Sequence, residues 1–191
     1  MSIRIVAGDI TTFKGDAIVN AANNAGLGGG GVDGAIHRAA GPRLLEHCKT
    51  LPVHPNMRGL GKGMTITHEV RIPTGAIVTT PGFDLPCQYI LHTAGPLFPV
   101  GEPDTTTLHQ LQACYRNGLL VARNRGLKRI AFPAISAGVY GCPMDLCART
   151  ALGLANAVPS LDVTFYIFPE VPSLAIWLAV AKELGIEVAP R

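Results

Sequence analysis

The stretch AIVNAANNAGLGGGGVDGAIH, near the N-terminus, carries polar side chains whose types and spacing could support chemistry. Asn20 and Asn23 follow an apolar run, and Asp33 and His37 stand one helical turn apart, so they share a helix face. A carboxylate can accept a proton during a reaction, whereas an amide can only orient the reacting groups. Between the two pairs, glycines let the backbone approach a ligand, and a helix start offers free N–H groups to an anion. The pattern predicts a pocket for a phosphorylated ligand with polar groups beside it.

An alternation of strand-like and helix-like segments must position these groups. Apolar runs predict strands, and apolar residues at helical spacing predict helices, with glycine and proline marking their ends. Because helices of crossover length separate most strands, we expect a largely parallel sheet with helices on both faces. The expected strands are residues 3–7, 17–20, 64–67, 76–80, 88–93, 129–134 and 163–168, and the expected helices are 32–40, 43–49, 105–124, 144–158 and 173–184.

A second glycine-bearing loop, ISAGVYG at residues 135–141, follows another of the expected strands. Ligands of such folds bind outside the carboxyl ends of the strands. Two glycine-bearing loops at one sheet edge can hold a diphosphate from both sides. The first loop formally satisfies the dinucleotide-binding pattern, but the acid at suitable spacing, Glu46, falls in an expected helix rather than at a strand end, which disfavours a dehydrogenase.

The composition fits one compact α/β domain spanning residues 1–191. Hydrophobic residues make up 48% of the 191 residues and charged residues only 15%, which excludes disorder. Residues 51–72 are rich in proline and glycine, and we expect a long surface loop there, either a flap over the ligand cleft or a solvated insertion. A net charge of +3 suits a small anionic ligand but is too weak to indicate nucleic-acid binding.

Location and metal content follow from what the sequence lacks. We expect no signal peptide and no membrane association, because no apolar run approaches the roughly 20 residues that a span needs. The five cysteines have scattered spacing, which favours reduced thiols in a cytoplasmic protein over a disulfide framework. No pair has the spacing of metal ligands, so we expect no metal site, and nothing pairs Cys142 with a base as a nucleophile would require.

Six motifs in order resemble a macrodomain, specifically the MacroD-type branch of ADP-ribose-hydrolysing macrodomains. Each motif alone is weak, but each lies at an expected strand end or helix start, and together they span most of the chain. The motifs are GDIT at residues 8–11, IVNAAN at 18–23, GGGGVDGAIHRAAG at 28–41, PTGAIVTTPGFDLP at 73–86, HTAGP at 92–96 and FPAISAGVYGCP at 132–143.

The resemblance implies a three-layer α/β/α fold around a mixed, largely parallel six-stranded sheet. It also implies an ADP-ribose cleft and hydrolysis of mono-ADP-ribosyl esters on acidic protein side chains, of O-acetyl-ADP-ribose, or of both, without a metal or cofactor. The implied partners are ADP-ribosylated proteins or O-acetyl-ADP-ribose, with nucleic acid only as ADP-ribosylated ends, and we expect a monomer. The alternative that the same pocket allows is a non-catalytic ADP-ribose reader.

The resemblance also implies roles for individual residues. Asn23 and Asp33 match the catalytic positions, and His37 either supports them or packs behind the loop. Asn20 either holds the glycine loop or contacts the distal ribose. The implied ADP-ribose contacts are Asp9, Ile10 and Phe168 at the adenine, and Gly29, Gly30, Gly31, Val32, Ser136, Ala137, Gly138, Val139 and Tyr140 around the diphosphate and ribose.

Two loop positions depart from the usual pattern of that family. Ala137 stands where relatives usually carry threonine, which removes a hydroxyl, and Gly28 stands where many relatives have a larger residue.

Tyr140 is interpreted as a lid on the ribose or as a loop anchor. His92, on an apolar expected strand, is interpreted as a buried core histidine whose ring nitrogens are hydrogen-bonded.

Overall fold

The computed structural model describes residues 2–100, 103–168 and 171–190 and contains a six-stranded sheet. All neighbouring strands are parallel except the last pair, in which β5 runs antiparallel to β6. The prediction of a mixed, largely parallel sheet is therefore confirmed. In spatial order the strands are β1 (Ile3–Ala7), β8 (Asp162–Ile167), β7 (Arg129–Pro133), β2 (Ala17–Ala22), β6 (Tyr89–Ala94) and β5 (Val78–Pro81).

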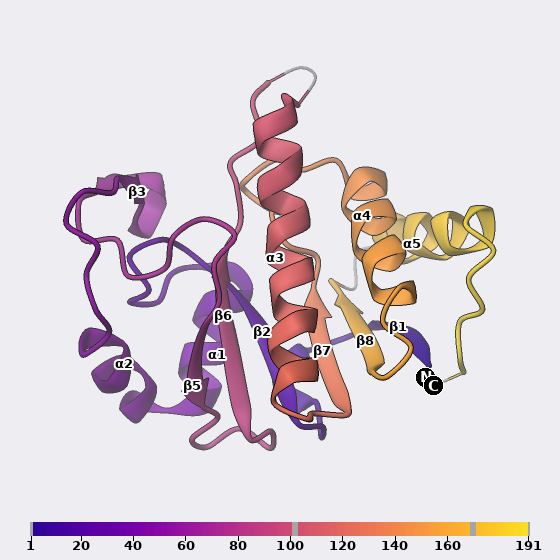
Figure 1. The fold of residues 1–191 in the computed structure, drawn as a ribbon, viewed down its shortest axis with the longest axis horizontal. Helices are drawn as coiled ribbons and strands as arrows, with labels where there is room; N and C mark the ends of the chain where they lie inside the picture. The colour runs from indigo at the N-terminus through magenta and orange to yellow at the C-terminus, as the bar shows by residue number, and fades with distance from the viewer. Residues whose placement is uncertain (1, 101–102, 169–170, 191) are drawn as a thin grey trace.

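Helices cover both faces of this sheet, as the alternation of elements predicted (Figure 1). Successive strand residues point to opposite faces, so Ile18 packs in the core beneath α1 and α2, while Val19 packs in the core beneath α3, α4 and α5. This arrangement is the expected three-layer α/β/α architecture. The helices are α1 (Gly31–Ala40), α2 (Pro42–Lys49), α3 (Thr105–Asn124), α4 (Met144–Asn156) and α5 (Val171–Glu183).

The expected element bounds hold to within a few residues, with physical reasons for the differences. β2 continues beyond residue 20 because Ala21 and Ala22 still pair in register with β6. The short strand expected at 64–67 is shorter, since Met64 has a φ of 63° and ends a 3₁₀ turn, η2 (Lys62–Met64). Only β4 (Ile66–Thr67) remains extended, paired with β3 (Gly59–Leu60). No helix in the described ranges is long and apolar enough to cross a membrane.

A single residue, Asn24, fastens the 51–72 segment to the end of β2. Its backbone N–H donates to the Leu60 carbonyl at 3.0 Å, and its carbonyl accepts from the N–H groups of Arg71 and Ile72 at 2.9 and 3.1 Å. Its side-chain Oδ1 accepts from Leu60 N at 2.8 Å, and its Nδ2 donates to the Ile72 carbonyl at 2.9 Å and to Thr74 Oγ1 at 3.1 Å. The segment is therefore docked on the residue that follows Asn23.

We predict that Asn24→Ala lowers the free energy of unfolding by about 3 kcal/mol, because it removes three hydrogen bonds and leaves backbone groups of Leu60 and Ile72 without side-chain partners. Urea unfolding measures this change, and proteolysis within the 51–72 segment should accelerate in parallel. Asn124→Ala, at the exposed end of α3, is the matched control. Equal stability of the two variants would contradict this anchoring role.

Candidate active site

Four neighbouring parallel strands bring the sequence-predicted residues to one edge of the sheet. The strands β1, β8, β7 and β2 are adjacent in that order, and their carboxyl ends lead to Asp9, Phe168, Ser136 and Asn23 respectively. Adjacent strands are about 4.8 Å apart, so β1 and β2 are separated by about 14 Å. An elongated ligand lying across these strand ends could contact all four positions.

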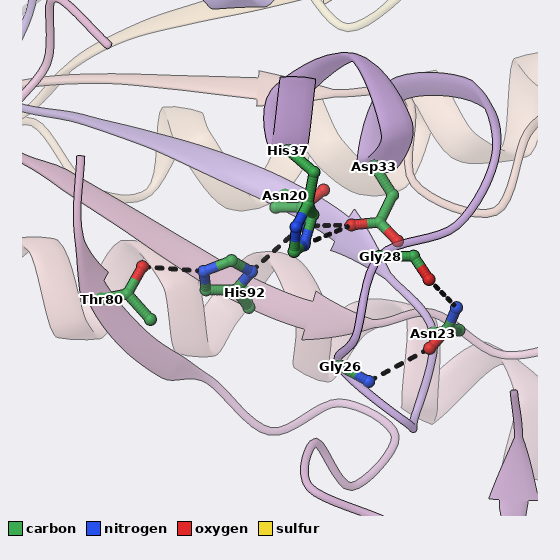
Figure 2. A network of polar contacts seen from close by, with 8 residues as sticks. All are labelled: Asn20, Asn23, Gly26, Gly28, Asp33, His37, Thr80 and His92. Carbon is green, nitrogen blue, oxygen red and sulfur yellow. Dashed lines mark hydrogen bonds and ion pairs between the residues drawn. The ribbon is translucent and has the colours of Figure 1, made fainter. Parts of the chain in front are cut away.

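Asp33 is the buried acid of this edge, with only 4% of its surface exposed in the first turn of α1. Figure 2 shows its Oδ1 accepting a hydrogen bond from Asn20 Nδ2 at 2.7 Å, with His37 Nε2 at 3.5 Å. Its other oxygen, Oδ2, is buried and has no hydrogen-bond partner in the described part of the chain. Oδ2 is therefore an acceptor that the protein leaves unused.

Opposing effects set the proton affinity of the Asp33 carboxyl. Burial is the largest and raises its pKa above the ordinary value, because it disfavours the charged form. The hydrogen bond from Asn20, and then the positive charge that His37 can carry, lower the pKa and oppose that effect. The result is a carboxylate that binds a proton more strongly than an exposed aspartate does, which suits a general base.

His92 fixes the orientation of the Asn20 amide from the neighbouring strand. The two residues lie opposite each other in the β2–β6 pairing, and Asn20 Nδ2 lies 3.0 Å from His92 Nδ1. His92 Nε2 lies 2.9 Å from Thr80 Oγ1 on β5, and that hydroxyl donates to the Pro81 carbonyl. One assignment satisfies all these contacts: Asn20 donates both amide hydrogens, to Asp33 and to His92, and the His92 proton resides on Nε2.

A flipped Asn20 amide would place its oxygen against the Asp33 carboxylate, so the network excludes that orientation. Burial, and then the neighbouring His37 and His47, lower the pKa of His92 to about 3, so the ring is neutral at ordinary pH. Both ring nitrogens are hydrogen-bonded, as we expected for a core histidine. The link to Asn20 was not predicted, and only the strand pairing could have revealed it.

Asn20 and Asn23 lie close together in the sequence but have different structural roles. Asn20 is fully buried beneath Asp33 and neither holds the glycine loop nor lies at the surface. The loop is held by Asn23, whose Oδ1 accepts from Gly26 N at 3.1 Å and whose Nδ2 donates to the Gly28 carbonyl at 3.2 Å (Figure 2). Gly26 and Gly28 have φ values of 67° and 81°, which favour glycine.

Gly29 passes directly over the catalytic candidates. A Cβ at this position would lie 3.0 Å from Asp33 Oδ2 and 3.1 Å from Asn23 Nδ2, so a larger residue would press on both side chains. At Gly30 and Gly31 a Cβ would meet nothing within 4 Å. The loop is thus closely packed on its inner side at Gly29 and open on its outer side one residue later, where α1 begins.

The second loop approaches Asp33 through Tyr140. Burial raises the pKa of the half-buried Tyr140, and the negative charge of Asp33 raises it further, so the phenol lies within electrostatic reach of that carboxylate. Ser136 has a φ of 62°, and its hydroxyl donates to the Pro96 carbonyl at 2.8 Å. The side chain of Ser136 therefore anchors the loop, which leaves Gly138 and Val139 exposed at its tip.

The opposite end of the strand edge is built from the remaining predicted contacts. Asp9 Oδ1 accepts from Thr11 N at 2.9 Å and caps the 3₁₀ turn η1 (Ile10–Thr12). Ile10 is buried in the core, whereas Phe168 has 70% of its surface exposed just after β8. Among the described residues, no three His, Cys, Asp or Glu side chains lie close enough to bind a metal ion.

Comparison with known proteins identifies the family to which this fold and site belong. A family model described as "Macro domain" matches residues 19–151, which include most of β2, the glycine loop, α1 and the second loop. The chain belongs to the Macro domain family. The resemblance seen in the sequence motifs is thereby confirmed at the level of the family.

Relatives and solved structures agree with this assignment. A Macro domain-containing protein of Ralstonia nicotianae is 50% identical over 80% of this chain and 77% of its own length. A protein of Enterobacter cloacae named O-acetyl-ADP-ribose deacetylase is 42% identical over 88% of this chain and 87% of its own. The structure titled Oceanobacillus iheyensis macrodomain with ADP has a TM-score of 0.80 and 38% identity, and covers 94% of this chain and 90% of that one.

We predict that His92→Gln flattens the acid dependence of this macrodomain's stability. The unfolded chain binds a proton on His92 near pH 6.5 and the folded chain only near pH 3. His92 therefore lowers the free energy of unfolding as pH falls between these values, by up to about 1.4 kcal/mol per pH unit. Chemical unfolding from pH 7 to pH 4 measures the slope.

Asp33, whose pKa is raised, contributes in the opposite direction, because the folded state then binds the extra proton. It is common to wild type and His92→Gln, so the difference between their slopes isolates His92. His109→Gln, an exposed substitution on α3, is the matched control. Identical slopes for wild type and His92→Gln would refute the buried neutral ring.

Proposed function

We propose that this macrodomain binds ADP-ribose and hydrolyses mono-ADP-ribosyl esters on acidic protein side chains, O-acetyl-ADP-ribose, or both. The observation that carries the proposal is the buried Asp33 carboxylate, which Asn20 and His37 hold by one oxygen while the other has no partner in the described protein. A purely binding module has no need of an acid that burial makes more basic. The network therefore favours an enzyme over a reader.

The strand edge supports an extended pose for ADP-ribose. The exposed ring of Phe168 offers a stacking surface to adenine, and Asp9 follows the adjacent strand β1. The diphosphate then lies between the second loop and the start of α1. Gly30, the N-cap of α1, makes no side-chain capping bond, so the first N–H groups of the helix can bind phosphate oxygens. The distal ribose is thereby directed toward Asn23 and Asp33.

Hydrolysis follows from the chemistry of Asp33. Its carboxylate takes a proton from a water molecule as the water oxygen attacks the ester, the ester C–O bond breaks, and Asp33 returns the proton to the departing oxygen, which gives ADP-ribose and a free acid. Gly29 covers Oδ2, so this backbone must shift slightly to admit the water or a ribose hydroxyl. Asn23 keeps the loop in register through Gly26 and Gly28 while that happens.

The relatives support both halves of the proposal. The Enterobacter cloacae protein is named for deacetylation of O-acetyl-ADP-ribose. A Trypanosoma brucei macrodomain is described as a complex with ADP-ribose, with a TM-score of 0.74, 36% identity, and coverage of 92% of this chain and 67% of that one.

We predict that Asp33→Asn lowers the rate of ester hydrolysis by about 10²–10⁴-fold and leaves ADP-ribose affinity within a few-fold, because an amide of the same size cannot take the proton. Single-turnover release of ADP-ribose from a protein modified on Asp or Glu, and from O-acetyl-ADP-ribose, measures the rate with EDTA present. Calorimetry measures ADP-ribose binding. Asp145→Asn, an exposed acid in the first turn of α4, is the matched control.

Each outcome separates two functions. Release by wild type and by Asp145→Asn, but not by Asp33→Asn, supports a metal-independent hydrolase centred on Asp33. Binding of ADP-ribose by all three proteins, with no release from any adduct, would make the domain a reader and overturn the enzyme. Equal collapse of ADP-ribose binding and hydrolysis in Asp33→Asn would overturn the assignment of Asp33 as the base.

A further inference from the structure

A cavity of about 470 Å³ lies between α1, α2 and the 51–72 segment, outside the ADP-ribose cleft outlined above. We refer to it as the α1–α2 groove. Its apolar side chains are Leu27, Pro42 and Leu45, and its basic side chains are His37, Arg38 and Lys62. None of the described residues that line it is an Asp or a Glu.

The two permanent cations of the α1–α2 groove are free to bind a ligand. Arg38 and Lys62 are exposed, and neither contacts an acidic side chain anywhere in the described part of the chain. The two acids that pair with cations of α2 are engaged away from Arg38 and Lys62: Glu46 pairs with Lys49 at 2.7 Å, and Asp84 pairs with Arg43 at 2.6 Å. The groove therefore combines an apolar surface with two uncompensated positive charges.

The α1–α2 groove and the candidate active site share one wall. Gly28 and Gly29 line the groove, and Gly29 also covers Asp33 Oδ2 from above. The His37 ring lines the groove, would meet a Cβ on Gly28 at 3.4 Å, and reaches to 3.5 Å from Asp33 Oδ1 (Figure 2). A molecule in the groove therefore lies one backbone thickness from the groups assigned to hydrolysis.

We propose that the α1–α2 groove binds an acidic peptide segment that flanks an ADP-ribosylated Asp or Glu. The inference rests on the proposed function, which places the ester bond beside Asp33. Arg38 and Lys62 would then bind carboxylates of neighbouring residues, while Leu27, Pro42 and Leu45 contact the aliphatic parts of the peptide. A nucleic-acid end fits less well, because the described lining offers no Phe, Tyr or Trp for base stacking and only two permanent cations.

The 51–72 segment supplies one of the two cations of the α1–α2 groove. Lys62 belongs to the 3₁₀ turn η2, between the two strands β3 and β4, and Asn24 fastens this unit through Leu60. The segment is therefore a wall of the substrate groove rather than a solvated insertion. It holds a cation at a fixed position relative to the glycine loop, because Asn23 and Asn24 are consecutive residues.

The test compares wild type with the double variant Arg38→Gln/Lys62→Gln on two ADP-ribosylated peptides. One peptide carries acidic residues on both sides of the modified Glu, and the other carries serines. We expect KM for the acidic peptide to rise about tenfold in the double variant, with kcat unchanged, since two exposed charge contacts are lost. KM for the serine peptide and for O-acetyl-ADP-ribose should change less than twofold.

Lys182→Gln, an exposed lysine on α5 at the other face of the sheet, is the matched control and should leave every KM unchanged. Raised salt should weaken wild-type turnover of the acidic peptide more than that of the serine peptide. An equal rise in KM for the acidic peptide, the serine peptide and O-acetyl-ADP-ribose would contradict binding of an acidic peptide in the groove. A larger loss on an ADP-ribosylated DNA end than on the acidic peptide would overturn the peptide as its occupant.

Failure of the proposed function is distinguishable from failure of the groove. Should wild type hydrolyse no adduct, equilibrium binding of the same intact peptides tests the groove alone. Wild type should bind the acidic peptide more tightly than the serine peptide, and Arg38→Gln/Lys62→Gln should bind both equally. That result would support peptide binding in the α1–α2 groove of a non-catalytic reader. Equal binding of both peptides by wild type would overturn it.

Discussion

The hydrogen bond from Asn20 to Asp33 ties the sheet to the helix that starts the candidate active site. Burial makes a charge on Asp33 costly, and a short bond from a fixed amide is what offsets that cost. The amide is fixed because its second hydrogen is bound by His92, and His92 is held in turn by Thr80. Three neighbouring strands, β2, β6 and β5, thus act on one carboxylate on α1.

Two consecutive asparagines, Asn23 and Asn24, follow β2 and hold different parts of the chain. Asn23 turns inward to the glycine loop, where it holds Gly26 and Gly28. Asn24 turns to the 51–72 segment and satisfies backbone groups of Leu60, Arg71 and Ile72. The two residues follow the end of β2, and Asn24 begins a turn. The loop and the segment are consequently held in a fixed relation to each other.

Local pattern was enough to predict the helices on both faces, the mostly parallel sheet and two glycine-bearing loops at one edge, because these depend on periodicity and crossover length, whereas the roles of Asp9 and Phe168 came from the family resemblance. The contact between Asn20 and His92 could not be predicted from local pattern, because His92 lies 72 residues away and only the β2–β6 register brings the two together. The same holds for Asn24, whose side-chain partners are 36 to 50 residues distant. Local pattern also did not reveal that the Ser136 hydroxyl donates to the Pro96 carbonyl, 40 residues away in the sequence.

The docking of the 51–72 segment has a consequence for how such a domain can be varied. Most of its attachment to β2 runs through main-chain atoms of Leu60, Arg71 and Ile72, which any sequence supplies. Its exposed side chains can therefore be exchanged while Asn24, the buried Val70, Arg71 and Ile72, and the glycine at position 59, where a Cβ would clash with Asn24, are retained. Grafting the exposed part of this segment from other members of the family would change the surface beside the glycine loop while Asn20, Asn23 and Asp33 stay in place.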